Sequence, residues 1–175
     1  EGSSIYLEEG EQMRAIDLVY SMMLQSANDA ALTLACYISE DMESFSALMN
    51  EKAKSLGLED TNFENPHGLD AKNHYTSAHD LALITAEALK NETFRKITST
   101  YKKEVASNLK SRLLVNHNKM LKSYDGCIGV KTGYTKKSGR SLVSAAERDG
   151  LTLISVTIDA PSDWSDHTKM LDYGY

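Results

Sequence analysis

The chain has 175 residues, of which 41% are hydrophobic and 25% charged, so it can bury one sizeable core. Its 19 basic and 25 acidic residues give a net charge of -6, and no local basic patch offsets it, which excludes a nucleic-acid partner. Polar residues interrupt the apolar stretches well before membrane-spanning length, and residues 1–4 lack the pattern of a signal peptide.

The first part of the chain spaces its apolar residues at intervals of three and four, which predicts amphipathic helices. We predict three of them here, over residues 15–24, 29–38 and 41–56. Asp41 suits the N-cap of the third, and Gly57 its C-terminal stop.

A loop follows at residues 65–68, where asparagine, proline and glycine gather. After it, Ser77 and Asp80 have the spacing of a capping box, which predicts a helix over residues 78–90. About residues 11–98 should therefore form a mainly helical subdomain.

The pattern then changes to short runs rich in β-branched residues. We predict strands over residues 102–106, 111–116, 128–134, 139–147 and 151–159. Asp149-Gly150 separates the last two, and this dipeptide favours an antiparallel hairpin.

A short amphipathic pattern closes the chain and predicts a helix over residues 162–172. Ser162 suits its N-cap, and Gly174 lies just past its end. About residues 99–175 should thus form an antiparallel sheet with a terminal helix, and the fold class is α+β.

Two short polar motifs stand where side chains can be aimed into a cleft. Ser26-Ala27-Asn28 lies at a junction of two predicted helices, and Lys131-Thr132-Gly133 lies at the end of a predicted strand. The first can present a hydroxyl and an amide, and the second a lysine, a hydroxyl and unobstructed backbone. Together they could hold and polarise a small acyl substrate.

Plainer interpretations exist for each motif alone. Ser26 and Asn28 would also serve to cap the helix that begins near Asp29, and Lys131 would also suit a solvated strand end. Lys137-Ser138-Gly139 is a second, looser lysine-hydroxyl-glycine match in a turn. The order and spacing of the two motifs decide between these readings.

In that order and spacing the chain resembles the penicillin-binding serine-type D-alanyl-D-alanine carboxypeptidases of the low-molecular-mass, peptidase S11 type. The resemblance covers nearly the whole chain. Its main stretches are residues 25–30, 63–69, 74–78, 116–118 and, most specifically, 129–135. It implies a β-lactamase/transpeptidase-like fold, and a hydrolase that binds penicillin and removes the terminal D-alanine of peptidoglycan stem peptides through an acyl-enzyme, outside the cytoplasm.

The resemblance also implies roles for single residues. Ser26 would relay a proton to the leaving D-alanine, Asn28 would hydrogen-bond the substrate amide, and Lys131 would supply positive potential. Thr132 would bind the terminal carboxylate, Gly133 would let the ligand approach the strand, and the N–H of Tyr134 would form half of an oxyanion hole. No cofactor and no metal is implied, and the five histidines show no metal-ligand spacing.

The family's nucleophile lies in an S-x-x-K motif that precedes S-x-N. Here the matches are Ser99 with Lys102 and Ser107 with Lys110, and both follow S-x-N, so we reject them. We therefore expect that the chain lacks the nucleophile, two N-terminal strands and the central helix. The strand over residues 151–159 would then have an open edge, to be covered by an N-terminal fragment, a partner chain or a swapped copy.

Two alternatives remain. A class A β-lactamase would need an E-x-x-x-N signature, and the match at Glu87 and Asn91 lies late in a predicted helix. A non-catalytic fragment that retains the cleft is the other.

Overall fold

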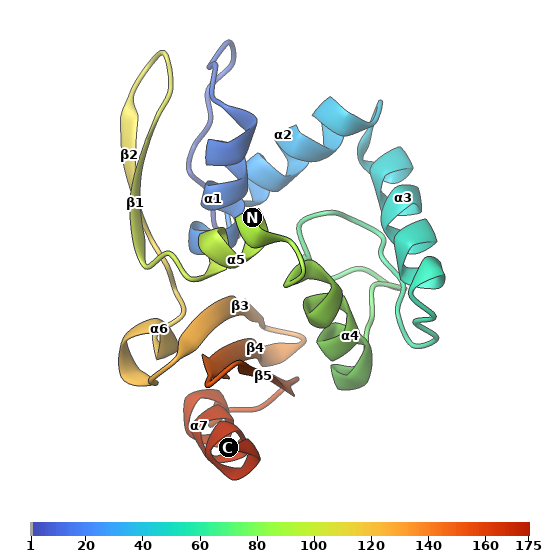
Figure 1. Ribbon diagram of the computed structural model, residues 1–175. Coiled ribbons are helices and arrows are strands. Elements are labelled where there is room, and N and C mark those ends of the chain that lie inside the picture. Colours follow the sequence, from blue (N-terminus) through green and yellow to red (C-terminus); the bar gives the residue numbers. More distant parts are fainter. Residues whose placement is uncertain (1) are drawn as a thin grey trace.

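The computed structural model describes residues 2–175 and shows helices and antiparallel strands in one body (Figure 1). The helices are α1 (Ala15–Gln25), α2 (Asn28–Ile38), α3 (Met42–Ser55), α4 (Ala78–Ala88), α5 (Glu92–Thr98), α6 (Met120–Ser123) and α7 (Asp163–Gly174). The strands are β1 (Lys102–Ala106), β2 (Ser111–Val115), β3 (Cys127–Thr135), β4 (Gly139–Arg148) and β5 (Leu151–Thr157). The predicted α+β class is confirmed.

The long helices end where the sequence predicts. The side chain of Asp41 accepts a hydrogen bond from Ser44 N at 2.7 Å and so caps α3. Gly57 follows α3 with a φ of 72°, a left-handed conformation that glycine adopts without strain. Ser77 caps α4 by accepting from the N–H of Asp80.

Three predictions at helix ends are wrong. The carboxylate of Asp80 does not complete a capping box, because it accepts hydrogen bonds from Thr61 Oγ1 at 2.7 Å and Asp60 N at 3.0 Å instead. Ser162 makes no side-chain cap bond at the start of α7. Gly174 lies inside α7, since the helix continues past residue 172.

The strands form two separate sheets. Strands β3, β4 and β5 form a three-stranded antiparallel sheet in that order, and β1 and β2 form a ribbon of their own that packs against α1. Asp149 and Gly150 turn the β4–β5 hairpin with φ values of 50° and 80°, as the sequence predicts. Within residues 2–175, β4 is the one strand that pairs with β5.

The three-stranded sheet has a helix on each face (Figure 1). Alternate residues of β4 point to opposite sides, so Leu142 and Ala146 pack with α7, whereas Val143 and Ala145 pack against the α4 side. A third cluster joins α1 and the start of α2 to the β1–β2 ribbon. The candidate site lies where this helical cluster meets the edge strand β3. No helix in residues 2–175 is long and apolar enough to cross a membrane.

Candidate active site

Ser26 occupies the turn between α1 and α2 in a strained backbone conformation. Its φ of 55° and ψ of 35° are left-handed, which few residues other than glycine adopt without a compensating environment. The next residue, Ala27, is fully buried in the core, and Ser26 and Asn28 on either side line the same cleft. The buried alanine thus fixes the turn that carries the two polar side chains.

Lys131 reaches this turn from strand β3. Its Nζ donates a hydrogen bond to Ser26 Oγ and another to the carbonyl of Thr132 at 2.6 Å. Because burial disfavours the charged ammonium, the pKa of Lys131 is lowered from 10.5 to about 8. These two hydrogen bonds hold the Lys131 side chain in place, unlike a solvated lysine at a strand end, and the two sequence motifs line one cleft.

Strand β3 presents an open edge to the cleft. It pairs with β4 along one side, with Thr132 opposite Leu142 and Gly133 opposite Ser141. A Cβ on Gly133 would meet Ser141 at 3.8 Å, an ordinary contact, so packing inside the protein does not require glycine here. Glycine instead leaves backbone accessible from the cleft, beside the 71% exposed side chain of Tyr134.

The segment before α1 forms another part of the cleft wall. Ser3 O accepts a hydrogen bond from Asn28 N at 2.9 Å, and Gly2 and Ser3 both line the cleft. Gly2 approaches so closely that a Cβ there would lie 2.2 Å from Asn28 Nδ2, and its φ of 90° also favours glycine.

The carboxylate of Asp29 fastens this wall to α2. It accepts hydrogen bonds from Ser4 Oγ at 2.7 Å and from the N–H groups of Leu7 at 3.0 Å and Ile5 at 3.2 Å. Burial raises the pKa of Asp29, but these hydrogen bonds outweigh it and hold the pKa below its ordinary value. Asp29 therefore stays ionised and holds the N-terminal segment against the S-x-N turn.

The segment from Asn116 to Asn118 packs next to the cleft. The side chain of Asn116 donates to Thr98 O at 3.3 Å and accepts from Asn118 N at 2.9 Å. Both asparagines are buried, and they hold His117, which lines a hollow next to the cleft together with Ser26 and Thr132. Burial and then the charge of Lys131 lower the pKa of His117, so the imidazole is neutral near pH 7.

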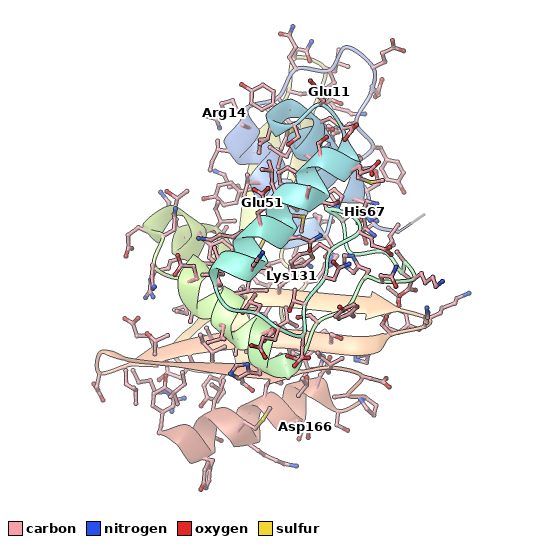
Figure 2. The ribbon with its side chains drawn as sticks, turned by 90° about the vertical axis from the view of Figure 1, so that its right-hand side faces the viewer. Glu11, Arg14, Glu51, His67, Lys131 and Asp166 are labelled. Carbon is pink, nitrogen blue, oxygen red and sulfur yellow. The ribbon has the colours of Figure 1, made fainter. Side chains whose placement is uncertain are left out.

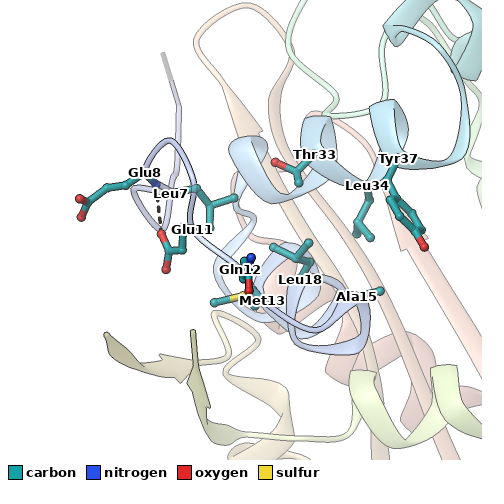
Figure 3. A pocket seen from close by; sticks show the side chains of 10 residues that line it. All are labelled: Leu7, Glu8, Glu11, Gln12, Met13, Ala15, Leu18, Thr33, Leu34 and Tyr37. Carbon is teal, nitrogen blue, oxygen red and sulfur yellow. Dashed lines mark hydrogen bonds between the residues drawn. The ribbon is translucent and has the colours of Figure 1, made fainter. Parts of the chain in front are cut away.

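The cleft has a volume of about 620 Å³ and continues into a second hollow beyond Thr132. Its far wall is a loop over residues 66–69, to which the sequence patterns assigned no role. Figure 2 shows His67 on this loop, on the same side of the molecule as Lys131. Another hollow, between residues 7–13 and α2, shares no lining residue with the cleft (Figure 3).

The competing candidates lie outside the cleft. Ser99 Oγ donates to Arg95 O at 2.8 Å, and Ser107 Oγ donates to Lys110 O at 3.1 Å, so both hydroxyls serve local turns. Glu87 forms an ion pair with Lys90 at 2.7 Å, and Asn91 caps α5. Residues 2–175 contain no cluster of three or more His, Cys, Asp or Glu side chains that could hold a metal ion.

Comparison with known proteins agrees with this geometry. The model of the D-alanyl-D-alanine carboxypeptidase family, peptidase S11, matches residues 1–162. D-alanyl-D-alanine carboxypeptidase DacF of Bacillus subtilis is 39% identical over 99% of the chain and 46% of its own length. DacC of Escherichia coli is 37% identical over 99% of the chain and 44% of its own length.

Solved structures show the same fold. A mutant of the Streptomyces K15 DD-transpeptidase superimposes with a TM-score of 0.94 at 33% identity, over 99% of this chain and 72% of that one. A D-alanyl-D-alanine carboxypeptidase from Mycobacterium tuberculosis gives a TM-score of 0.90 at 32% identity, over 99% and 69% of the two chains. The chain spans about half the length of the two curated relatives above.

Proposed function

The chain belongs to the peptidase S11 family of D-alanyl-D-alanine carboxypeptidases, and we propose that it forms two walls of the active site of such an enzyme. The whole protein would remove the terminal D-alanine from peptidoglycan stem peptides, and β-lactams would acylate it. One observation carries the proposal: Lys131, with its lowered pKa, donates a hydrogen bond to the left-handed Ser26 across the cleft.

The reaction would proceed in two steps. A serine hydroxyl of an S-x-x-K segment attacks the carbonyl carbon of the penultimate D-alanine and gives its proton to the lysine of that segment. The C–N bond breaks, and the leaving amine takes a proton through Ser26. Water then hydrolyses the ester and releases the shortened peptide.

The described residues suit the other parts of this reaction. The ammonium of Lys131 polarises Ser26 Oγ and supplies positive potential for the proton path. Thr132 lines the cleft and the hollow beside it, which suits its role in binding the substrate carboxylate. The N–H of Tyr134, on the open edge of β3, would be one half of the oxyanion hole, and Asn28 would hold the substrate amide.

The acylating serine and its lysine are assigned to an S-x-x-K segment outside these 175 residues. It would lie ahead of the S-x-N motif in the polypeptide, and the protein would act outside the cytoplasm. Labelled penicillin followed by peptide mapping tests this. The full-length protein should carry one adduct on that serine, and an adduct on Ser26, Ser99 or Ser107 would contradict the assignment.

A further inference from the structure

Asp70 links the two long walls of the cleft at one end. Its Oδ1 accepts hydrogen bonds from Thr135 Oγ1 at 2.9 Å and from Ser138 Oγ at 2.8 Å. Asp70 follows the loop of residues 66–69, whereas Thr135 ends strand β3 and Ser138 lies in the β3–β4 turn. We call this group of three residues the clasp.

The loop that carries Asp70 is braced from within. The side chain of Asn65 donates to Leu69 O at 2.9 Å and accepts from Gly68 N at 2.7 Å, and Asn73 N donates to Glu64 Oε2 at 2.8 Å. Within residues 2–175, the two hydrogen bonds that cross from this loop to the sheet both end on Asp70. The carboxylate therefore fixes where a loop that is already rigid stands relative to β3.

The clasp also orders the end of the strand. Thr135 Oγ1 accepts from Ser138 N at 2.9 Å while it donates to Asp70, so one hydroxyl joins the turn to the loop. Thr135 lines the cleft, and Ser138 is not among its lining residues. A change at Ser138 can thus weaken the clasp without touching the cleft.

The clasp lies at a defined distance from the reacting groups. Thr132 and Thr135 are three residues apart on β3, and a strand rises about 3.3 Å per residue, which places the clasp roughly 10 Å along the strand from Thr132. Because the terminal carboxylate of the substrate would lie at Thr132, an extended peptide that pairs with the open edge of β3 would reach the clasp with its third residue from the C-terminus, two positions before the bond that is broken. A substrate that carries only an acetyl group in place of that third residue would end at the clasp and have no residues beyond it.

We propose that Asp70 is a positioning residue that selects for long stem peptides, by holding the loop of residues 66–69 against β3 where the distal residues of the peptide would lie. This inference rests on the proposed carboxypeptidase function. Preorganised walls lower the entropy lost when a flexible ligand binds, so the clasp acts on binding of long peptides rather than on bond breaking.

The test compares two substrates in the full-length protein: N-acetyl-D-alanyl-D-alanine and the stem pentapeptide L-Ala-γ-D-Glu-L-Lys-D-Ala-D-Ala. Asp70→Ala should raise KM for the pentapeptide about three- to tenfold, the effect of losing one or two hydrogen bonds, with kcat unchanged. Both constants for the short substrate should stay the same. Asp70→Asn, whose amide oxygen can accept both hydroxyls, should behave like the parent protein.

Ser138→Ala should give a weaker form of the same effect, and combined with Asp70→Ala it should add nothing further. It also serves as the test variant if Asp70→Ala lowers the thermal midpoint. Asp166→Ala is the charge-matched control, because Asp166 lies on α7, far from Lys131 in Figure 2.

Equal losses on both substrates, no loss on either, or additive effects of Asp70→Ala and Ser138→Ala would overturn the role of the clasp. A parent protein that cleaves neither substrate would instead overturn the proposed function, and the clasp inference with it.

Discussion

Lys131 Nζ donates a hydrogen bond to Ser26 Oγ although 105 residues separate the two in the sequence. Neither residue alone would indicate a catalytic site, because a serine at a helix end and a lysine on a strand are common. Burying the Lys131 ammonium costs free energy, as does the left-handed backbone of Ser26. Such costs are typical of functional sites. Their coincidence in one cleft therefore supports a catalytic pair.

The lowered pKa of Lys131 predicts how acylation depends on pH. The charged ammonium supplies the positive potential, so acylation by penicillin should fall as the pH rises through about 8, where Lys131 loses its proton. Lys131→Arg keeps the charge at all accessible pH values and should remove this alkaline limb, even if its rate is lower. A profile in which the parent rate rises above pH 8 would show that neutral Lys131 is the active form.

Asp29 should matter for stability as well as for the cleft. Asp29→Ala would remove the acceptor for Ser4 Oγ and for two backbone N–H groups, and should lower the free energy of unfolding by about 2–3 kcal/mol. It should also slow acylation, because the segment that carries Ser3 loses its attachment to α2 at Ser4, Ile5 and Leu7. Asp41→Ala, which removes one exposed helix cap, is the control and should lower stability less, with normal acylation.

If Asp29→Ala unfolds no more readily in denaturant than Asp41→Ala, the carboxylate of Asp29 does not stabilise the N-terminal segment that lines the cleft. Asp29→Asn should retain part of the effect, because one amide oxygen remains as an acceptor.

His167 should make the protein sensitive to acid. Its ring is fully buried and shares hydrogen bonds with Ser144 Oγ at 2.8 Å and Thr157 Oγ1 at 3.0 Å. Burial lowers its pKa from 6.5 to about 4, despite the nearby carboxylates of Asp163 and Asp166. Between these values the unfolded chain binds the proton more readily, so stability is fully present above pH 6.5 and is lost as the pH falls towards 4.

The expected loss over this window is at most about 3 kcal/mol, and unfolding in urea at a series of pH values measures it. His167→Gln should be less stable near pH 7 but should show a smaller fall with acid, because only His67, His74 and His117, whose pKa values burial also lowers, would remain. His79→Gln is the control, since this imidazole is 79% exposed. Parallel curves for the parent protein and His167→Gln would rule out His167 as the acid-sensitive group.

The sequence predicts most of the secondary structure because long helices and strands repeat their apolar residues with a clear period. It does not predict α5, which has seven residues and thus too few turns for a pattern to appear. Asn91 is the N-cap of that helix, a role that its local sequence could have suggested. Ser162 does not cap α7. The sequence does not reveal this, because tertiary structure decides which partner a serine side chain binds.

The candidate site also has a part that the sequence predicts and a part that it does not. Motif spacing points to Ser26 and Lys131, because Ser26 directly follows α1 and Lys131 lies within β3, and both elements are predictable. The clasp is not predictable in this way, since Asp70 lies in a loop without periodicity and its partners on β3 and the following turn are 65 and 68 residues away. The bracing role of Asp29 depends likewise on contacts to a segment of irregular structure.

The rate of acylation by a labelled penicillin, measured in the full-length protein, tests the central claim most directly. Ser26→Ala and Lys131→Ala should each lower this rate about 10²- to 10⁴-fold, because each removes a proton relay or a preorganised charge. Both should change the free energy of unfolding by only about 1 kcal/mol. The matched controls Ser55→Ala and Lys54→Ala, on the exposed side of α3, should acylate at the parent rate. Near-normal acylation in both cleft variants would contradict the account and remove Ser26 and Lys131 from the mechanism.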